Sequence, residues 1–283
     1  MTPSIWERTF SFQGRKLFYN TIPYNHISER CVEIPIAFDF LAYLKNKSKI
    51  LEIGNVLSYY ENSLSDFIGL RNRRIVDKFE ACLGVDNVDL MDLPSEEKYS
   101  SIVSISTVEH IGQGITPKGE YGEQSSANDL ESPLKAIAKV YDLLMVQGQA
   151  LITVPFGKLT NFGWFIQFST HYLRLLETKF RVPKKAISLS FLKRSTIEQV
   201  GNNSHQLWIE SKEQDLAEVE YGTSGGGANA ISVIALTKLS DNFVLDINVP
   251  STPLVYQKPP EHTNNNQQWR KKFVSNDVWD CLS

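Results

Sequence analysis

The stretch that decides the fold is residues 49–60, KILEIGNVLSYY. Apolar residues flank the acid Glu52, and the run breaks at Gly54 into a short turn before a helix-compatible segment. This pattern predicts a buried strand that delivers a carboxylate and a glycine turn to the edge of a sheet. Glycine adopts backbone angles that a Cβ forbids, and it lets a ligand approach closely. Ligands of open α/β sheets bind outside the carboxyl ends of the strands, so we expect a cofactor at this turn.

Four more apolar segments follow, and most of them carry polar residues at their ends. They are residues 74–77 (RIVD), 88–94 (VDLMDLP), 99–110 (YSSIVSISTVEH) and 150–157 (ALITVPFG). A helical pattern over residues 134–145 and a turn at 147–149 precede the last of them. Strands this apolar, separated by helical segments, predict a parallel sheet that is covered on both faces.

This succession of motifs resembles the class I S-adenosylmethionine-dependent methyltransferases over residues 50–239. It is most similar to a bacterial group with a LEIGNVLS, VDK and SISTVEHIG pattern and an N-terminal element that here reads ERCVEIP at residues 29–35. The usual acid-x-Gly-x-Gly-x-Gly motif matches at Glu52 and Gly54, whereas Val56 and Ser58 hold the later glycine positions.

The resemblance implies a Rossmann-like, doubly wound, seven-stranded and mostly parallel sheet with an antiparallel last strand. Residues 187–193 and 231–239 would supply its final antiparallel pair. It also implies S-adenosylmethionine as cofactor, with S-adenosylhomocysteine as product. We divide the chain into an N-terminal hairpin and helix cap (1–48), the cofactor-binding domain (49–240) and a C-terminal tail or linker (241–283).

Outside the sheet, the sequence predicts four further features. They are a hairpin over residues 10–19, a helix over 25–44 interrupted by Pro35, a substrate-side loop over 112–129 and an aromatic helix over 159–180. From about residue 250 onward, Pro, Asn, Gln and Lys dominate. That composition is typical of a mobile tail or of a linker to a further C-terminal domain.

The composition excludes several classes of function. A chain of 283 residues, 42% of them hydrophobic, buries one substantial core. Its net charge of −3 argues against nucleic acid, which needs a basic stripe. The three cysteines have no spacing for zinc or disulfides, so we expect a cytoplasmic protein. The sequence begins without a signal peptide and holds no apolar run of about 20 residues, so no membrane contact is expected.

By the resemblance, nine residues would bind the cofactor: Glu52, Gly54, Asn55, Asp77, Lys78, Asp89, Leu90, Ser106 and Arg30. Asp77 would accept both ribose hydroxyls, with a helix N-cap as the competing role. Asp89 would accept from the adenine amine beside the Leu90 amide, with Asp92 as a rival acid. Lys78 would lie next to the adenine or in solvent.

Other assignments are equally open between function and packing. Glu52 and Gly54 could form an ordinary strand-to-helix turn, and Arg30 could pair within the chain instead of with a carboxylate of the cofactor or acceptor. His110 could take a proton from an acceptor hydroxyl, or it could be a packing residue. The remaining substrate contacts would be Glu109, Tyr221 and Asn229.

These residues favour a methyltransferase that acts on a small or medium-sized acceptor, most often at oxygen. The acceptor could be a natural-product intermediate, a peptide carboxylate or a glycan, and we expect no metal. A methyltransferase-like scaffold without turnover is the alternative, because Val56 and Ser58 replace two glycines. A nicotinamide oxidoreductase fits less well, since every later glycine of the dinucleotide fingerprint is missing. The chain would act as a monomer or a homodimer.

Overall fold

The computed structural model describes residues 8–21, 28–124, 129–200, 203–222 and 227–259. Within these residues the centre is an eight-stranded sheet in the order β11-β10-β12-β7-β6-β3-β4-β5. Its strands are β3 (Ile50–Ile53), β4 (Arg74–Val76), β5 (Val85–Asp86), β6 (Tyr99–Ile105), β7 (Leu144–Pro155), β10 (Ile187–Val200), β11 (Asn203–Ser211) and β12 (Ala230–Thr237). Strands β3 to β7 are parallel to one another.

The antiparallel end of the sheet confirms the predicted pair. β12 lies between β7 and β10 and is antiparallel to both. The predicted number of seven strands is wrong by one, because β11 pairs antiparallel with β10 and extends the sheet. The polar sequence between β10 and β12 gave no alternating signal for that strand. The Rossmann-like, doubly wound class itself is confirmed.

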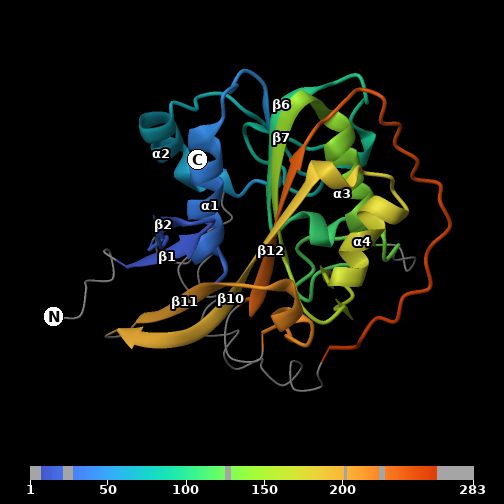
Figure 1. Ribbon diagram of the computed structural model, residues 1–283. Helices are drawn as coiled ribbons and strands as arrows, with labels where there is room; N and C mark the ends of the chain where they lie inside the picture. Colours follow the sequence, from blue (N-terminus) through green and yellow to red (C-terminus); the bar gives the residue numbers. More distant parts are fainter. Residues whose placement is uncertain (1–7, 22–27, 125–128, 201–202, 223–226, 260–283) are drawn as a thin grey trace.

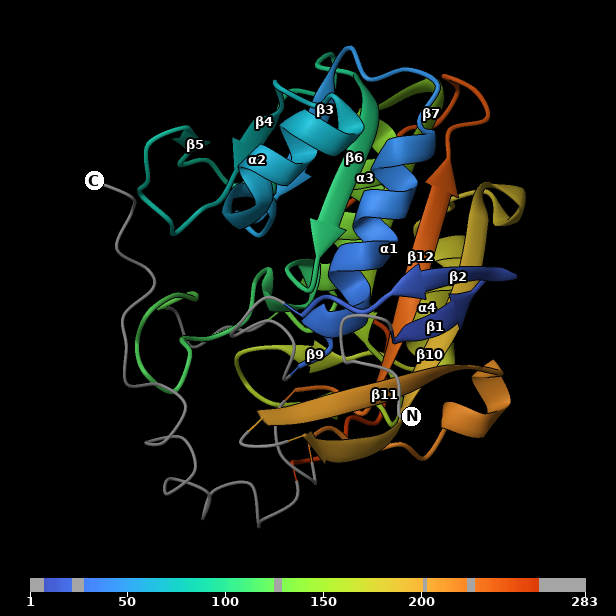
Figure 2. The same cartoon turned by 90° about the vertical axis from the view of Figure 1, so that its left-hand side faces the viewer.

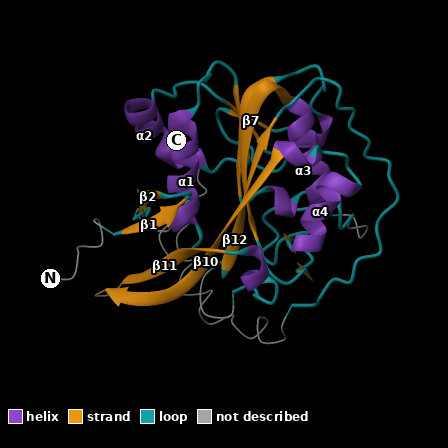
Figure 3. Ribbon diagram, in the orientation of Figure 1, coloured by secondary structure: helices purple, strands orange, loops and turns teal. Residues whose placement is uncertain are grey.

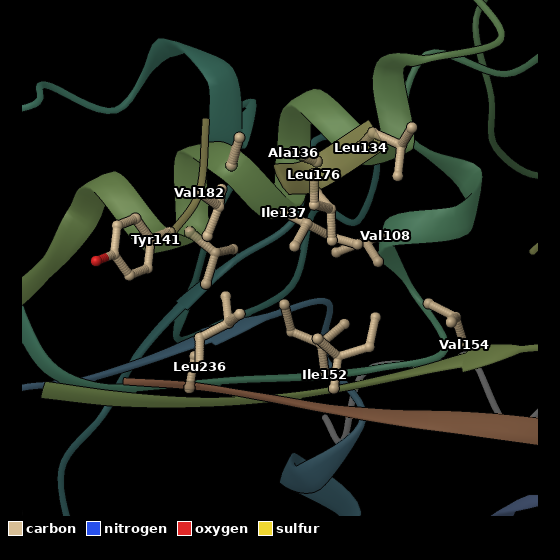
Figure 4. Close-up of a cluster of buried hydrophobic side chains, with 14 of the residues drawn as sticks. Val108, Leu134, Ala136, Ile137, Tyr141, Ile152, Val154, Leu176, Val182 and Leu236 are labelled. Carbon is tan, nitrogen blue, oxygen red and sulfur yellow. The ribbon is translucent and has the colours of Figure 1, made fainter. Parts of the chain in front are cut away.

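Helices cover both faces of the sheet, as Figure 1 shows. They are α1 (Arg30–Tyr43) and α2 (Glu61–Ser63) on one side and α3 (Ser132–Leu143) and α4 (Thr170–Thr178) on the other. A hydrophobic cluster lies on each face of the sheet, and alternate side chains of a strand such as β3 pack into one cluster or the other. In β3, Leu51 and Ile53 join the cluster below α3 and α4, whereas Ile50 joins the cluster below α1. Figure 4 shows the first cluster, with Ile137 of α3 and Leu176 of α4 facing Ile152 of β7.

The N-terminal cap is a hairpin followed by a helix. The hairpin β1 (Thr9–Phe12) and β2 (Arg15–Phe18) is confirmed, and Figure 2 shows it beside α1. The predicted helix begins at Arg30, and residues 25–27 lie outside the described part of the chain. Pro35 sits inside the helix without breaking it. Proline lacks an N–H for the carbonyl four residues earlier, and that carbonyl, of Cys31, accepts from Asn20 N at 2.9 Å instead.

Three predicted elements are wrong. The third strand is β5, two residues long, and residues 90–92 form a short 3₁₀ helix rather than a strand. The aromatic segment 159–180 is not one helix: it holds the hairpin of β8 (Thr160–Asn161) and β9 (Ile166–Gln167) before α4. The turn expected at 147–149 lies within β7, where Gln147 has a φ of 64°. Side-chain character alone did not separate aromatic strand from aromatic helix.

The described part of the C-terminal tail packs against the domain. Phe243 contacts the Tyr141 ring of α3 at 4.9 Å, and Gln257 N donates to Leu159 O at 2.9 Å. In Figure 1 this segment runs past α3 and α4. The predicted mobile tail therefore does not begin at residue 250, and residues 260–283 lie outside the described range. None of the described helices has both the length and the apolar character that crossing a bilayer requires.

Candidate functional site

The predicted cofactor residues lie at the carboxyl ends of the parallel strands, and backbone contacts join those ends. Gly54 N, after β3, donates to Val76 O of β4 at 2.9 Å. Asp77 N, after β4, donates to Asp86 O of β5 at 3.1 Å. On the other side, Gly54 abuts Thr107 after β6. Four consecutive strand ends therefore form one continuous edge, the position at which such sheets bind ligands.

Glu52 holds the first turn of this edge. Its Oε1 accepts from Val56 N at 2.9 Å and from Leu57 N at 2.6 Å. Its Oε2 accepts from Arg73 Nε at 2.5 Å, and both side chains are almost fully buried. Burial raises the pKa of Glu52, although Arg73 opposes that shift. Both carboxylate oxygens are engaged within the chain, so the direct role of Glu52 is to shape the turn.

Gly54 occupies a position that only glycine fits. Its φ of 81° lies in the left-handed region. A Cβ at this residue would lie 2.3 Å from Thr107 Oγ1. The turn is therefore pressed against the residue that follows β6, and Val56 and Ser58 replace glycine only at positions beyond this contact.

Asp77 organises the turn after β4. Its Oδ1 accepts from Phe79 N at 2.8 Å and from Glu80 N at 2.9 Å. No helix follows, so the expected alternative of a helix N-cap becomes a cap of a short turn. Among the described residues, no hydrogen bond is made by Asp77 Oδ2. Half of this carboxylate holds the backbone while the other half remains available.

Glu80 was missed by the sequence analysis. It accepts from Asn55 Nδ2 at 2.6 Å, which links the turns after β3 and β4. Burial raises the pKa of Glu80, and the charge of Asp77 adds to this effect. Its position three residues after Asp77 was the available signal, since both acids follow the same strand end.

Lys78 bridges the acids on the adenine side of the predicted site. Its Nζ lies 3.0 Å from Asp89 Oδ2 and is also hydrogen-bonded to Glu123. These bonds raise the pKa of Lys78, although burial acts in the opposite direction. Asp89 Oδ1 accepts from Met91 N at 2.9 Å, while the Leu90 side chain is buried. Asp89 is thus both a cap and an ion-pair partner.

A second group of residues gathers where β6 ends below α1. Ser106 has a φ of 40°, which is unusual for a residue with a Cβ. Its Oγ donates to Glu33 Oε1 at 2.6 Å. Arg30 Nη1 donates to Ile105 O at 2.8 Å and lies 3.4 Å from Glu33 Oε2. Arg30 and Glu33 share this helix, and the structure shows the pairing of Arg30 within the chain that was the alternative to a ligand contact. Backbone strain of this kind gathers at functional sites.

His110 lies in an aromatic cluster. Its Nδ1 is 2.9 Å from Trp164 O, so Nδ1 carries the proton, because a carbonyl only accepts. The ring stacks on Trp164 at 5.2 Å and meets Tyr121 edge-on at 5.5 Å. Burial lowers the pKa of His110 to about 4. The imidazole is therefore neutral near pH 7, and Nε2 presents a lone pair.

Glu109 precedes this histidine and is 2% exposed. Its Oε1 lies 3.9 Å from His110 Nε2, and its buried Oε2 has no hydrogen-bond partner within the described chain. Burial raises the pKa of Glu109 well above its usual range, and the charges of Glu33 and Glu29 add to that effect. This carboxyl is the least satisfied acid of the site.

The late-loop residues reach the same region through aromatic and backbone contacts. The Tyr221 ring lies 4.9 Å from that of Phe165, which also contacts His110. Asn229 accepts from Arg194 and donates to Glu220 O at 2.6 Å. Tyr221 therefore joins the His110 cluster, whereas Asn229 serves to hold the loop. Residues 223–226, between Tyr221 and Asn229, lie outside the described residues.

A large cavity of about 630 Å³ lies elsewhere, near the amino ends of β3 and β4. Lys49, Arg71 and Arg74 line it, but Arg74 is paired with Asp86 and Glu97. It contains none of the predicted site residues. Across the described residues, no three His, Cys, Asp or Glu side chains are arranged to hold a metal ion.

Comparisons with known proteins bear on the fold. No protein-family model matches the chain, and no curated protein matches its sequence. The solved structure of the N-methyltransferase NodS from Bradyrhizobium japonicum WM9 is similar over 72% of this chain and 94% of its own, at 10% identity and a TM-score of 0.37. A SAM-dependent methyltransferase from Archaeoglobus fulgidus is similar over 71% and 90%, at 16% identity and a TM-score of 0.40.

A third similar structure is TehB from Haemophilus influenzae, over 72% of this chain and 62% of its own. Its identity is 12% and its TM-score is 0.40. Identities and scores this low carry no argument about this chain, so its chemistry has to be argued from the site itself.

Proposed function

We propose that this chain is an S-adenosylmethionine-dependent methyltransferase whose cofactor lies across the carboxyl ends of β3, β4, β5 and β6. The observation that carries the proposal is the continuous edge formed by Gly54, Asp77 and Thr107. It combines a left-handed turn at Gly54, a carboxylate after the next strand at Asp77 and the strained Ser106 beside Thr107 after β6, in the chain order that the sequence motifs predict.

The nucleoside half of the cofactor would lie over the turns after β4 and β5. Asp77 Oδ2 would accept from the ribose hydroxyls, while Oδ1 keeps its backbone bonds. Glu80, hydrogen-bonded to Asn55, is the second acid within reach of the same turn. Asp89 would accept from the adenine amine, and Lys78 would remain its partner at the rim.

The methionine half would lie over Gly54 and Ser106, below the start of α1. Arg30 sits at that helix start and would pair with the cofactor carboxylate. Glu52 would act indirectly, because it holds the Val56 and Leu57 amides in place. Preorganisation of this kind fixes the cofactor without further movement at the moment of reaction.

The acceptor would enter beside His110, and we propose an oxygen as the acceptor atom. Its lone pair would form the bond to the methyl carbon as the S–CH₃ bond breaks, and the electron pair of that bond would go to sulfur. His110 Nε2, with its lone pair, would hold the acceptor hydroxyl and receive its proton before solvent does. In-line positioning would supply much of the rate.

Calorimetry with S-adenosylmethionine and S-adenosylhomocysteine tests the proposal. Both should bind in the micromolar range or better, and Asp77→Ala should weaken both by at least tenfold, because a charge-assisted hydrogen bond contributes about 1.5–3 kcal/mol. Asp66→Ala, an exposed acid near α2, is the matched control and should bind as the wild type does. Equal affinity of Asp77→Ala and the wild type would refute the ribose role.

A scaffold without turnover is the second candidate. The ion pairs of Lys78 with Asp89 and Glu123 support it, because they occupy the adenine side with the chain's own groups. A scaffold need bind neither form of the cofactor. Mass spectrometry of a cell extract incubated with labelled S-adenosylmethionine would separate the candidates, since only the enzyme transfers the label.

A further inference from the structure

Glu109 is a buried acid with one carboxylate oxygen, Oε2, that has no hydrogen-bond partner among the described residues. Its side chain is 3% exposed. The nearest basic atom given by the structure is His110 Nε2, 3.9 Å from Oε1. That distance exceeds a hydrogen bond, and the ring is neutral near pH 7. An unsatisfied buried carboxyl lowers the free energy of unfolding. We therefore expect a bound ligand to supply the missing hydrogen-bond or ion-pair partner.

The charges around Glu109 leave an acid in excess. Glu33 is also fully buried, and Ser106 and Arg30 bind it. Glu29 accepts from Ala228 N at 2.9 Å. The two arginines of this region are already engaged, because Arg30 donates to Ile105 O and Arg194 donates to Asn229. Three acids therefore face two arginines, and Glu109 forms an ion pair with neither among the described residues, although the charge of Arg30 partly opposes the rise in its pKa.

The groups beside Glu109 are aromatic. His110 packs with Trp164, Phe165 and Tyr121 at ring distances between 5.2 and 5.7 Å. The charge of Glu109 raises the pKa of Tyr121 and of Tyr221, in both cases after burial, which places both phenols within its electrostatic reach. Aromatic faces attract cations, most strongly when water is excluded. The carboxyl of Glu109 and the aromatic rings beside it thus both favour a cationic ligand.

We infer that the methyl acceptor carries a protonated amine that binds Glu109, while His110 Nε2 holds the acceptor hydroxyl. The inference rests on the proposed function, since it names the acceptor class of that same site. Neither a neutral nor an anionic acceptor can form an ion pair with Glu109.

Three phenols of nearly equal size test the inference on protein saturated with S-adenosylhomocysteine. Tyramine is the cation, 4-propylphenol is its neutral isostere, and 3-(4-hydroxyphenyl)propanoate is the anion. Calorimetry should give tyramine at least a tenfold tighter Kd than 4-propylphenol, with the anion weakest. Glu109→Gln should remove the tyramine preference, whereas Glu96→Gln, an exposed control, should keep it.

A second readout does not need a variant. Because the pKa of unliganded Glu109 is raised well above its usual range, tyramine binding should release protons, and the heat of binding should depend on the ionisation enthalpy of the buffer. Binding of 4-propylphenol should release none. This measurement keeps the inference testable even where Glu109→Gln fails to fold.

The outcomes separate the two proposals. Failure of S-adenosylhomocysteine to bind refutes the proposed function. Normal binding of S-adenosylhomocysteine without a tyramine preference, including no measurable tyramine binding, overturns the acceptor inference alone. A third result also overturns it. If Glu109→Gln weakens binding of S-adenosylmethionine but not of S-adenosylhomocysteine, which lacks the sulfonium charge, then Glu109 faces the sulfonium rather than the acceptor.

Discussion

Replacing Gly54 by alanine tests the turn on which the site is built. Two costs add at this residue. A φ of 81° costs an alanine about 1–2 kcal/mol in the left-handed region. The new Cβ would lie 2.3 Å from Thr107 Oγ1 and 2.7 Å from Thr107 Cγ2, and overpacking of this kind costs about 1–3 kcal/mol. We therefore expect a loss of about 2–5 kcal/mol in the free energy of unfolding.

Gly69→Ala is the matched control, because its φ is 70° and nothing lies within 4 Å of the added Cβ. It should lose only the conformational part, about 1–2 kcal/mol. Adding Thr107→Ala to Gly54→Ala removes both clashing atoms and should recover at least half of the difference between the two glycine variants. Urea unfolding with a constant m-value measures all of them. If Gly54→Ala costs no more than Gly69→Ala, the pressed turn against Thr107 is refuted.

Two further predictions concern buried charges. Arg73→Met should lower the free energy of unfolding in urea by about 3–5 kcal/mol, because it leaves Glu52 as an uncompensated buried acid. Adding Glu52→Gln should recover part of that loss. If Arg73→Met alone is as stable as the wild type, the pairing is contradicted. The pKa of His110 is about 4 in the folded state, against an ordinary value of 6.5. As the pH falls, the unfolded chain therefore protonates this imidazole before the folded protein does, and stability decreases as the pH drops from 6.5 towards 4. Between pH 7 and pH 5 the wild type should lose up to about 2 kcal/mol more free energy of unfolding than His110→Gln. This value is an upper limit because the ring is 21% exposed. Parallel pH profiles of the two proteins would show that the ring is not buried in its neutral form.

The parallel half of the sheet was predictable because its strands are short and apolar. Residues 50–53 and 99–105 have helices on both faces and therefore lack polar alternation. Their turn residues follow directly, so Gly54 and Asp77 could be assigned to one edge of the sheet from the sequence alone. The same reasoning failed for β5, because a two-residue edge strand carries too few side chains to show a pattern.

The sequence did not reveal which residues form hydrogen bonds or ion pairs with each site residue. Glu52 could be recognised as a strand-end acid, but the arginine that pairs with it comes from the start of another strand, 21 residues later. Glu33 of α1 and Glu109 after β6 lie far apart in the chain, and only the fold brings their charges within reach of each other. The site roles of Asp77, Asp89, Ser106 and His110 stay predictions until a ligand is bound.

A crystal structure of the protein with S-adenosylhomocysteine tests the central claim most directly. We expect both ribose hydroxyls within hydrogen-bond distance of Asp77 Oδ2 or Glu80, with the methionine half over Gly54 and the sulfur directed towards His110. Density for the nucleoside away from the edge formed by β3, β4, β5 and β6 would contradict the account.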